Sequence, residues 1–400
     1  MFDHVFSPIT IKGKTIKNRF TVPAMVCNFC NQDGTATERY IAYHEAKAKG
    51  GWGLIITEDY NVAPEGHGFS RTAGLWNDGQ IESHCALPER IHKYGTIILA
   101  QIYHCGRQTH TSAIPEGCHT RSSSAIACPF GDEIPIPFTT QEVKEMVAKY
   151  GDTALRAKKC GFDGVEIHGA HGYLITQFFS PYSNKRLDEY GGNFWNRTRF
   201  AREIIQDIRR KCGDDFIIDM RISADEFVEG GLTIEDSKAI AVMMEEAGLD
   251  MIHVSVGNYL SVDLNVASSY SAHGWFTDWA KQVKELVEVR KAAICSEYNW
   301  FADFVVGAVR HRALNLYRRV TDLLTDVEAE SSAVLTQYPQ QELVILMQLY
   351  IHLVKIFETV ENQVQYVNNE SETIMLSLEG MEFNFEDIKP LICAAGLKQQ

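Results

Sequence analysis

Short apolar runs alternate with longer amphipathic segments along the first 288 residues of the chain. The apolar runs have the length and the two-sided hydrophobicity of buried strands. They predict six strands, at residues 20–25, 53–60, 96–103, 164–168, 216–222 and 251–256. The amphipathic segments predict helices at residues 35–49, 81–94, 140–160, 196–212, 233–247 and 275–287. Six successive β-α units indicate a parallel sheet with helical crossovers.

Two α/β architectures have this alternation, the (β/α)8 barrel of TIM type and the doubly wound sheet. Polar residues at the ends of the predicted strands help to choose between them: Asp59, Gln101, His168, Arg221 and Ser255. Their convergence favours the barrel, because the active site of a barrel lies at the carboxyl ends of its strands. No G-x-G-x-x-G turn follows the first strand, which weakens the doubly wound alternative. We predict a TIM-type barrel that is incomplete or atypical after six units.

The pattern changes near residue 289. Only three of the 29 glycines lie in residues 289–400, where apolar positions recur at helical spacing over 309–327 and 343–364. We predict a barrel domain at 1–288 and an all-α C-terminal domain of unknown role at 289–400. Its apolar faces need a partner, which could be one another, the barrel or a second subunit. Residues 291–295 and 302–307 are weak candidates for the two missing strands.

Composition and charge narrow the functional class. The net charge of −14 disfavours nonspecific binding to nucleic acids or anionic membranes. No signal peptide is visible, and no run reaches the ~18 apolar residues of a membrane helix. The ten cysteines form no disulfide framework. We therefore expect a cytoplasmic protein with reduced thiols.

Chemistry concentrates just after the fourth predicted strand. His168 and His171 are three residues apart, so both would lie on one face if the turn between them is helical. Two imidazole N–H groups could then hold one carbonyl oxygen, and Tyr173 could supply a proton to an adjacent carbon. Two histidines at this spacing could instead bind zinc, but no third ligand is evident and no metal is predicted. Taken singly, each of the three residues could also be structural.

Residues 166–199, EIHGAHGYLITQFFSPYSNKRLDEYGGNFWNRTR, carry a long and specific pattern. This segment resembles the old yellow enzyme and 2,4-dienoyl-CoA reductase family of NAD(P)H:flavin oxidoreductases. Supporting matches are FSPITIKGKTIKNRF at residues 6–20, GLIITE at 53–58 and DMRISADEFVEGGL at 219–232. The resemblance covers about residues 1–288. It implies an FMN-dependent enzyme that uses NADH or NADPH to reduce the C=C bond of an α,β-unsaturated carbonyl compound, an enone or an enoyl-CoA thioester.

The resemblance also implies roles for individual residues. His168 and His171 would bind the carbonyl oxygen, and Tyr173 would protonate the α-carbon. The positions that match the family's flavin contacts are Pro23, Met25, Val26, Asp59, Gln101 and Arg221. Gln101 would bond the pyrimidine edge, and Arg221 would place positive charge near flavin N1. Val26 departs from members with cysteine or threonine there, and the acidic Asp59 stands where a small residue is common.

A different class of function stays open. The family pattern ends near residue 287, before the loops that bind the FMN phosphate in such barrels. The chain could therefore be a degenerate, non-catalytic barrel that serves as a scaffold, with the helical segment as an interaction or oligomerisation module. Cys27 and Cys30 form a CxxC pair without a second CxxC, which we interpret as ordinary thiols. Only Cys295 and Cys393 lie after the barrel, too few for an iron–sulfur cluster.

Overall fold

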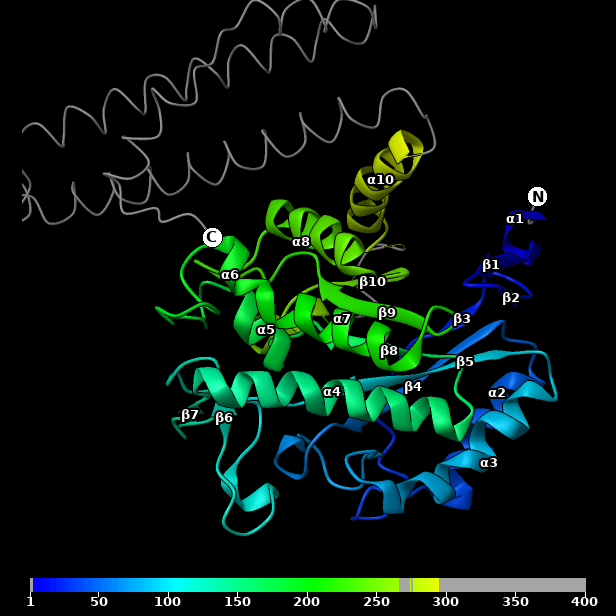
Figure 1. The fold of residues 1–400 in the computed structure, drawn as a ribbon, viewed down its shortest axis with the longest axis horizontal. Coiled ribbons are helices and arrows are strands. Elements are labelled where there is room, and N and C mark those ends of the chain that lie inside the picture. The colour runs from blue at the N-terminus through cyan, green and yellow to red at the C-terminus, as the bar shows by residue number, and fades with distance from the viewer. Residues whose placement is uncertain (1–2, 266–273, 275, 295–400) are drawn as a thin grey trace, which may run out of the picture. The chain divides into compact units, whose positions relative to one another are not determined.

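Six parallel strands form one continuous sheet, and their order across the sheet is the same as their order along the chain (Figure 1). They are β3 (Thr21–Val22), β4 (Leu54–Asn61), β5 (Ile97–Tyr103), β8 (Gly164–Gly169), β9 (Ile217–Ser223) and β10 (Met251–Ser255). All six strands predicted from the sequence are present. The computed structural model describes residues 3–265, 274 and 276–294.

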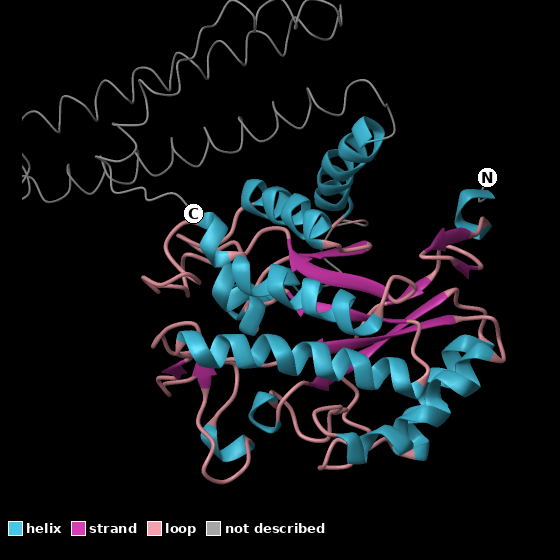
Figure 2. Cartoon of the chain, viewed as in Figure 1, coloured by secondary structure: helices cyan, strands magenta, loops and turns pink. Residues whose placement is uncertain are grey.

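Five principal helices connect the strands, a sixth follows the last described strand, and these helices pack on the outer face of the sheet (Figure 2). They are α2 (Glu38–Lys49), α3 (Ile81–His92), α4 (Thr140–Cys160), α7 (Arg199–Cys212), α8 (Ile234–Ala247) and α10 (Thr277–Ile294). Thr139 caps α4 reciprocally with Glu142, and Gly161 ends it with a left-handed φ of 97°. Helix α10 is longer than predicted and includes residues 291–294, so this candidate for a seventh strand is wrong.

The two faces of the sheet differ, and this difference distinguishes a barrel from a doubly wound sheet. On the outer face, Ile98, Val165 and Ile218 pack in one large core with residues of the helices. On the inner face, Leu54 and Leu99 belong to a separate small cluster. A doubly wound sheet has helices on both faces and reverses its strand order. Consecutive strand order with helices outside is the arrangement of the first six units of a barrel.

Smaller elements were not predicted. A hairpin of β1 (Ile9–Ile11) and β2 (Lys14–Ile16) contributes Ile16 to the inner cluster, next to the amino ends of the barrel strands. The remaining elements are α1 (Asp3–Phe6), η1 (Pro64–Gly66), η2 (Asp78–Gln80), η3 (Thr111–Ala113), β6 (Arg121–Ser122), β7 (Ile136–Pro137), α5 (Leu174–Phe179), α6 (Phe194–Arg197), η4 (Tyr259–Ser261) and α9 (Val262–Asn265). Strands β6 and β7 pair within the segment between β5 and α4.

The described residues belong to a single unit that spans residues 1–295. None of their helices has the length and apolar character needed to cross a membrane. Of the predicted C-terminal helical domain, only residues 289–294 are described, as the end of α10. The remainder of that prediction, including the strand candidate at 302–307, lies outside the described residues.

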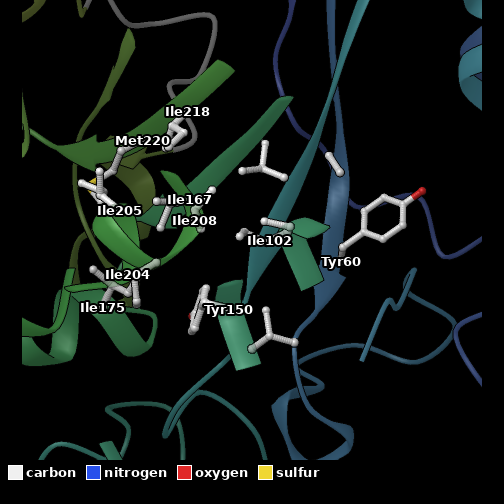
Figure 3. Close-up of a cluster of buried hydrophobic side chains, with 14 of the residues drawn as sticks. Tyr60, Ile102, Tyr150, Ile167, Ile175, Ile204, Ile205, Ile208, Ile218 and Met220 are labelled. Carbon is white, nitrogen blue, oxygen red and sulfur yellow. The ribbon is translucent and has the colours of Figure 1, made fainter. Parts of the chain in front are cut away.

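The main core fills the space between the sheet and its helices. Its members include large side chains from both layers (Figure 3): Ile102, Ile167, Ile175, Ile218, Met220, Tyr150, Ile204, Ile205 and Ile208. The α7 isoleucines recur at positions 204, 205 and 208, the spacing of one helix face, and each is fully buried. Burial of this stripe fixes α7 against the sheet.

Truncation of this stripe is expected to be costly. Ile205→Ala should lower the free energy of unfolding by about 2–5 kcal/mol, because it removes buried apolar surface and leaves a cavity. Arg210→Ala on the exposed face of the same helix should change it by about 0.5 kcal/mol or less. Urea unfolding of both variants tests this. Equal effects of the two substitutions would mean that α7 does not pack as described.

Candidate active site

Polar side chains replace apolar ones partway along the inner face of the barrel. Gln101 on β5 lies opposite Glu166 on β8, and Glu166 lies opposite Asp219 on β9. One step further toward the carboxyl ends, His168 lies opposite Arg221. Because side chains alternate along a strand, residues two apart point to the same face. These five residues therefore form two stacked polar layers above the apolar inner cluster.

A β-bulge brings Asp59 to the same face. Strand β4 pairs regularly with β5 up to Ile56, then shifts register so that Asp59 rather than Glu58 lies opposite Gln101. The Asp59 side chain is 3% exposed. Glu58 instead accepts hydrogen bonds from the backbone N–H groups of Cys27 (2.5 Å) and Asn28 (3.2 Å). Because of the bulge, the Asp59 side chain points into the barrel, whereas the Glu58 side chain binds the loop after β3.

Glu166 is the anionic centre of the inner layer. Its carboxylate accepts hydrogen bonds from Gln101 Nε2 at 2.5 Å and from His253 Nδ1 at 2.7 Å. Burial opposes its ionisation, but His253 and Arg221 outweigh burial and hold the pKa of Glu166 at about 2. Burial and the neighbouring Glu166 raise the pKa of Asp219 well above its usual range. One charged and one neutral carboxyl group therefore lie side by side.

Two histidine rings meet at the carboxyl end of β8. The turn between them is not helical, because His171 has a left-handed φ of 60°. That turn still brings the rings together edge to face, with centroids 5.1 Å apart. His168 is 4% exposed and His171 is 7% exposed. The two predicted histidines are therefore close together, but through a left-handed turn and not through the helical turn that their spacing suggested.

Both imidazoles are neutral near pH 7. Burial lowers the pKa of His168 to about 3 and the pKa of His171 well below its usual value, and Arg221 adds to both effects. His168 Nδ1 accepts the N–H of Ala170 at 3.3 Å, so the ring proton is on Nε2. His171 Nε2 lies 2.8 Å from the Ser255 hydroxyl, and with that hydroxyl as donor the proton of His171 is on Nδ1. Each ring then keeps one N–H available.

Tyr173 packs beside the histidines. Its ring centroid is 4.7 Å from that of His168 and 5.4 Å from that of Tyr103. Burial, above all, raises the pKa of Tyr173 well above its ordinary value, so the phenol is protonated at neutral pH. Tyr173 precedes α5 and is 6% exposed. The structure thus brings all three sequence-predicted catalytic residues together.

The predicted flavin contacts fall into two groups. Asp59, Gln101 and Arg221 gather on the inner face, and Arg221 reaches the carbonyl oxygen of Ala24 in the loop after β3 at 3.3 Å. In that loop Pro23 is exposed, Val26 is half-buried and the apolar Met25 is 64% exposed. An exposed methionine beside a polar layer is what a planar aromatic ligand would cover.

Unpartnered polar atoms support a ligand at this place. Asp59 Oδ1 and Arg221 Nε are buried without a hydrogen-bond partner in the described structure. Buried polar atoms are normally satisfied, so orphans gathered among the predicted contacts indicate a missing partner. Gln101 uses its amide N–H toward Glu166 and keeps its carbonyl oxygen for another donor. This donor and acceptor set suits the polar edge of an isoalloxazine ring.

Sequence reasoning missed Glu166 and Tyr259 and identified Ser255 only as a polar residue at a strand end. Glu166 orients Gln101, Ser255 fixes the His171 ring, and Tyr259 bonds the Tyr173 hydroxyl. Glu166 stands two residues before His168, so the two-residue period of the strand would have identified it as inward-facing. Tyr259 had no such signal, since it follows its strand in an irregular turn.

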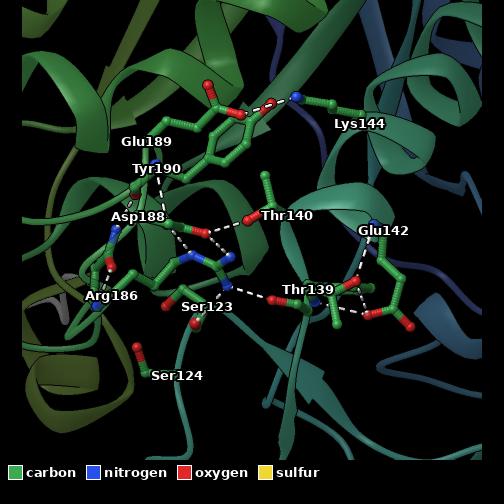
Figure 4. A network of polar contacts seen from close by, with 12 residues as sticks. Ser123, Ser124, Thr139, Thr140, Glu142, Lys144, Arg186, Asp188, Glu189 and Tyr190 are labelled. Carbon is green, nitrogen blue, oxygen red and sulfur yellow. Dashed lines mark hydrogen bonds and ion pairs between the residues drawn. The ribbon is translucent and has the colours of Figure 1, made fainter.

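The loop that follows α5 is held by an ion pair (Figure 4). The guanidinium of Arg186 binds the Asp188 carboxylate, with Nε 2.9 Å from Oδ1, and also donates to the carbonyl oxygen of Ser123. Asp188 accepts the hydroxyl of Thr140 at the start of α4. This part of the recognised motif therefore joins two long loops to a helix, in agreement with a structural role.

The CxxC pair lies beside this site. Burial raises the pKa of Cys27 to about 12, and burial and Glu58 raise the pKa of Cys30 still further. Thiols with raised pKa values are poor nucleophiles at neutral pH. Both are free, as are the other six cysteines of the described residues. The geometry agrees with the interpretation of ordinary thiols.

Asp59 should make stability depend on pH. Burial, then Glu58, raises its pKa well above the usual value, while Arg221 opposes the shift. The unfolded chain loses this proton near pH ~3.9, so unfolding becomes easier as pH rises from there toward the folded pKa. The Asp59→Asn variant cannot ionise at this position. Its free energy of unfolding, relative to that of the wild type, should therefore rise by about 1.4 kcal/mol per pH unit across that range. Urea unfolding at pH 5, 6 and 7 measures the difference; a constant difference would contradict a neutral Asp59.

Comparison with known proteins identifies the family. Residues 4–300 match the model of the NADH:flavin oxidoreductase / NADH oxidase family. The chain is 43% identical over 289 residues to the NADH oxidase of Thermoanaerobacter brockii, covering 72% of this chain and 44% of that protein. It is 37% identical over 292 residues to the NADPH dehydrogenase of Bacillus subtilis, covering 72% of this chain and 82% of that protein.

A solved structure of 2-naphthoyl-CoA reductase in complex with 2-naphthoyl-CoA has the same fold. The TM-score is 0.67 at 31% identity, and the match covers 71% of this chain and 45% of that one. The chain thus spans less than half the length of the T. brockii oxidase and of this reductase.

These matches confirm the barrel-type fold, the oxidoreductase class, and FMN with NADH or NADPH as cofactors. The similarity is not limited to a short motif, since the match to the family model covers almost all described residues. The chain belongs to the NADH:flavin oxidoreductase / NADH oxidase family.

Proposed function

We propose that this protein reduces the C=C bond of an α,β-unsaturated carbonyl compound at the His168, His171 and Tyr173 site. The observation that carries the proposal is the convergence of two neutral imidazoles and one protonated phenol at the carboxyl end of β8. Neutral rings with one free N–H each suit an oxygen that gains negative charge during the reaction. A general acid beside them suits protonation of the neighbouring carbon.

The protein side chains divide the work. His168 Nε2–H and His171 Nδ1–H would hold the substrate carbonyl oxygen and stabilise the enolate charge. Tyr173 would give its hydroxyl proton to the α-carbon. FMN, when bound, supplies the hydride for the β-carbon and is itself reduced by NADH or NADPH. Gln101 would bind its pyrimidine edge, Arg221 would place positive charge beside it, and the loop residues Pro23, Met25 and Val26 would cover its ring.

Asp59 does not oppose flavin reduction in this account. A charged carboxylate beside the ring would disfavour added electrons, but burial keeps Asp59 protonated. One relative of known structure suggests a class of substrate, because it was crystallised with an aromatic acyl-CoA thioester. We therefore propose an enoyl-CoA or aroyl-CoA thioester as a candidate substrate, in addition to simple enones. We further propose the division into a barrel at 1–288 and a helical domain at 289–400, with the latter as a site of self-association.

Flavin binding is the experiment that tests the proposal first. Purified protein is incubated with FMN, desalted and examined by visible absorbance. A retained flavin band near one equivalent, reduced by NADH or NADPH and restored by an enone without oxygen, is expected. A folded protein that retains no FMN would favour the scaffold alternative.

A further inference from the structure

Tyr259 lies directly against the predicted proton donor. It begins η4, shortly after the end of β10 at Ser255, and its hydroxyl oxygen is 3.1 Å from that of Tyr173. The two rings are nearly perpendicular, with centroids 5.9 Å apart. Within the described part of the chain, no other side chain is bonded to the Tyr173 hydroxyl. A phenol in this place is the natural source of a replacement proton.

The turn that carries Tyr259 is fixed by buried contacts. Asn258 caps it by accepting the N–H of Leu260 at 2.8 Å, and its side-chain amide donates to the Glu226 carboxylate at 3.1 Å. Ser261 donates its hydroxyl to the carbonyl oxygen of Glu226 at 2.8 Å. Asn258, Ser261 and Glu226 are all buried. These buried hydrogen bonds therefore fix the position of Tyr259.

The same turn is joined to the histidine that binds substrate. Gly257 accepts the hydroxyl of Ser223 at 2.7 Å, and the Ser223 oxygen accepts the N–H of His171 at 2.9 Å. Ser223 thus connects the turn that carries Tyr259 with the backbone of His171 through two hydrogen bonds.

The two phenols differ in their exposure to solvent. Tyr173 is 6% exposed and surrounded by aromatic rings, whereas Tyr259 is only half-buried. Burial raises the pKa of both, but the hydrogen bond from Tyr173 works in the opposite direction on Tyr259. Negative charge left after proton transfer is therefore better placed on Tyr259, nearer to water.

We propose that Tyr259 is a proton relay that recharges Tyr173 during enone reduction. This inference depends on the proposed function. As the C–H bond forms at the α-carbon, the O–H bond of Tyr173 breaks and its electron pair stays on the phenol oxygen. Tyr259 passes its own hydroxyl proton to that oxygen, and water returns a proton to Tyr259. With the hydride at the β-carbon, each turnover adds one hydride and one solvent proton to the substrate.

Tyr259→Phe in the FMN-loaded, NADPH-reduced protein tests the relay. Mixed anaerobically with cyclohexenone, it should react about 10-fold more slowly than the wild type. The dependence of this rate on the D2O fraction should be curved for the wild type, with two protons in motion, and linear for the variant. Tyr259→His, which can also carry a proton, should restore most of the rate. Tyr43→Phe, which removes a half-buried hydroxyl on α2, is the matched control and should match the wild type.

A second readout does not depend on turnover. In spectra of protein labelled with 13C at tyrosine Cζ, the Tyr173 signal should move in Tyr259→Phe and stay in place in Tyr43→Phe. An unmoved signal together with a wild-type rate would overturn the relay alone. A wild-type protein that binds FMN but does not react with the enone would remove the proposed function and the relay together.

Discussion

Tyr173→Phe is expected to slow the oxidation of reduced flavin by an enone about 100-fold or more, the usual contribution of a positioned general acid. The phenol is protonated, buried and 4.7 Å, ring to ring, from His168, so no neighbouring water can easily replace it. Reduction of the flavin by NADH or NADPH needs no proton from this residue and should stay within about twofold. Anaerobic stopped-flow measurement of the two half-reactions separates these effects.

The control for this prediction is ligand binding. If His168 and His171 anchor the carbonyl oxygen as proposed, they should also bind phenols that lie over the flavin. Tyr173→Phe should then keep the phenol affinity, while the double variant His168→Ala/His171→Ala should lose it. Equal loss of rate in both half-reactions would remove Tyr173 from the role of proton donor. Unchanged phenol binding in the double variant would remove the histidines as the carbonyl anchor.

Arg221→Met is expected to abolish retention of FMN and to lower the free energy of unfolding by about 3–5 kcal/mol. Arg221 is the cation beside Glu166, whose carboxylate is completely buried. Removing the guanidinium takes away one of the groups that offset this buried charge, and the hydrogen bonds from His253 and Gln101 remain. The variant also loses the contact with the carbonyl oxygen of Ala24, which ties the loop after β3 to β9. Urea unfolding and desalting after FMN addition measure the two effects.

Arg221→Lys is the matched variant. It keeps the positive charge but loses the planar, forked guanidinium. We expect it to recover most of the stability and only part of the FMN affinity, which would separate charge from geometry. An Arg221→Met protein that retains FMN as well as the wild type would mean that this guanidinium does not contact the cofactor.

The sequence predicted the scaffold well because its signals are local. Each strand of the sheet is an apolar run bounded by turn residues, and helix α4 has both a capping box and a terminal glycine. The end of α10 was misjudged, because nothing in the sequence near residue 287 stops a helix. The pair β6–β7 was missed because two-residue strands leave no periodic pattern.

The candidate site was predicted less evenly. His168, His171 and Tyr173 lie within six residues, so one motif was enough to connect them. The position of Asp59 depends on a bulge in β4, which a regular period of two cannot show. Tyr259 reaches Tyr173 across 86 positions of sequence, through a turn held by Glu226. Such contacts depend on which strands lie side by side and so become visible only in the folded chain.

We propose that this barrel passes a hydride from NAD(P)H, through FMN, to an enone. The most direct measurement is anaerobic: the flavin absorbance of the FMN-loaded protein is bleached with NADH or NADPH, and cyclohexenone or an enoyl-CoA is then added. We expect the absorbance to return in proportion to the enone, with a saturated ketone or acyl-CoA as product. A reduced flavin that stays bleached with every enone and recovers only with oxygen would contradict it.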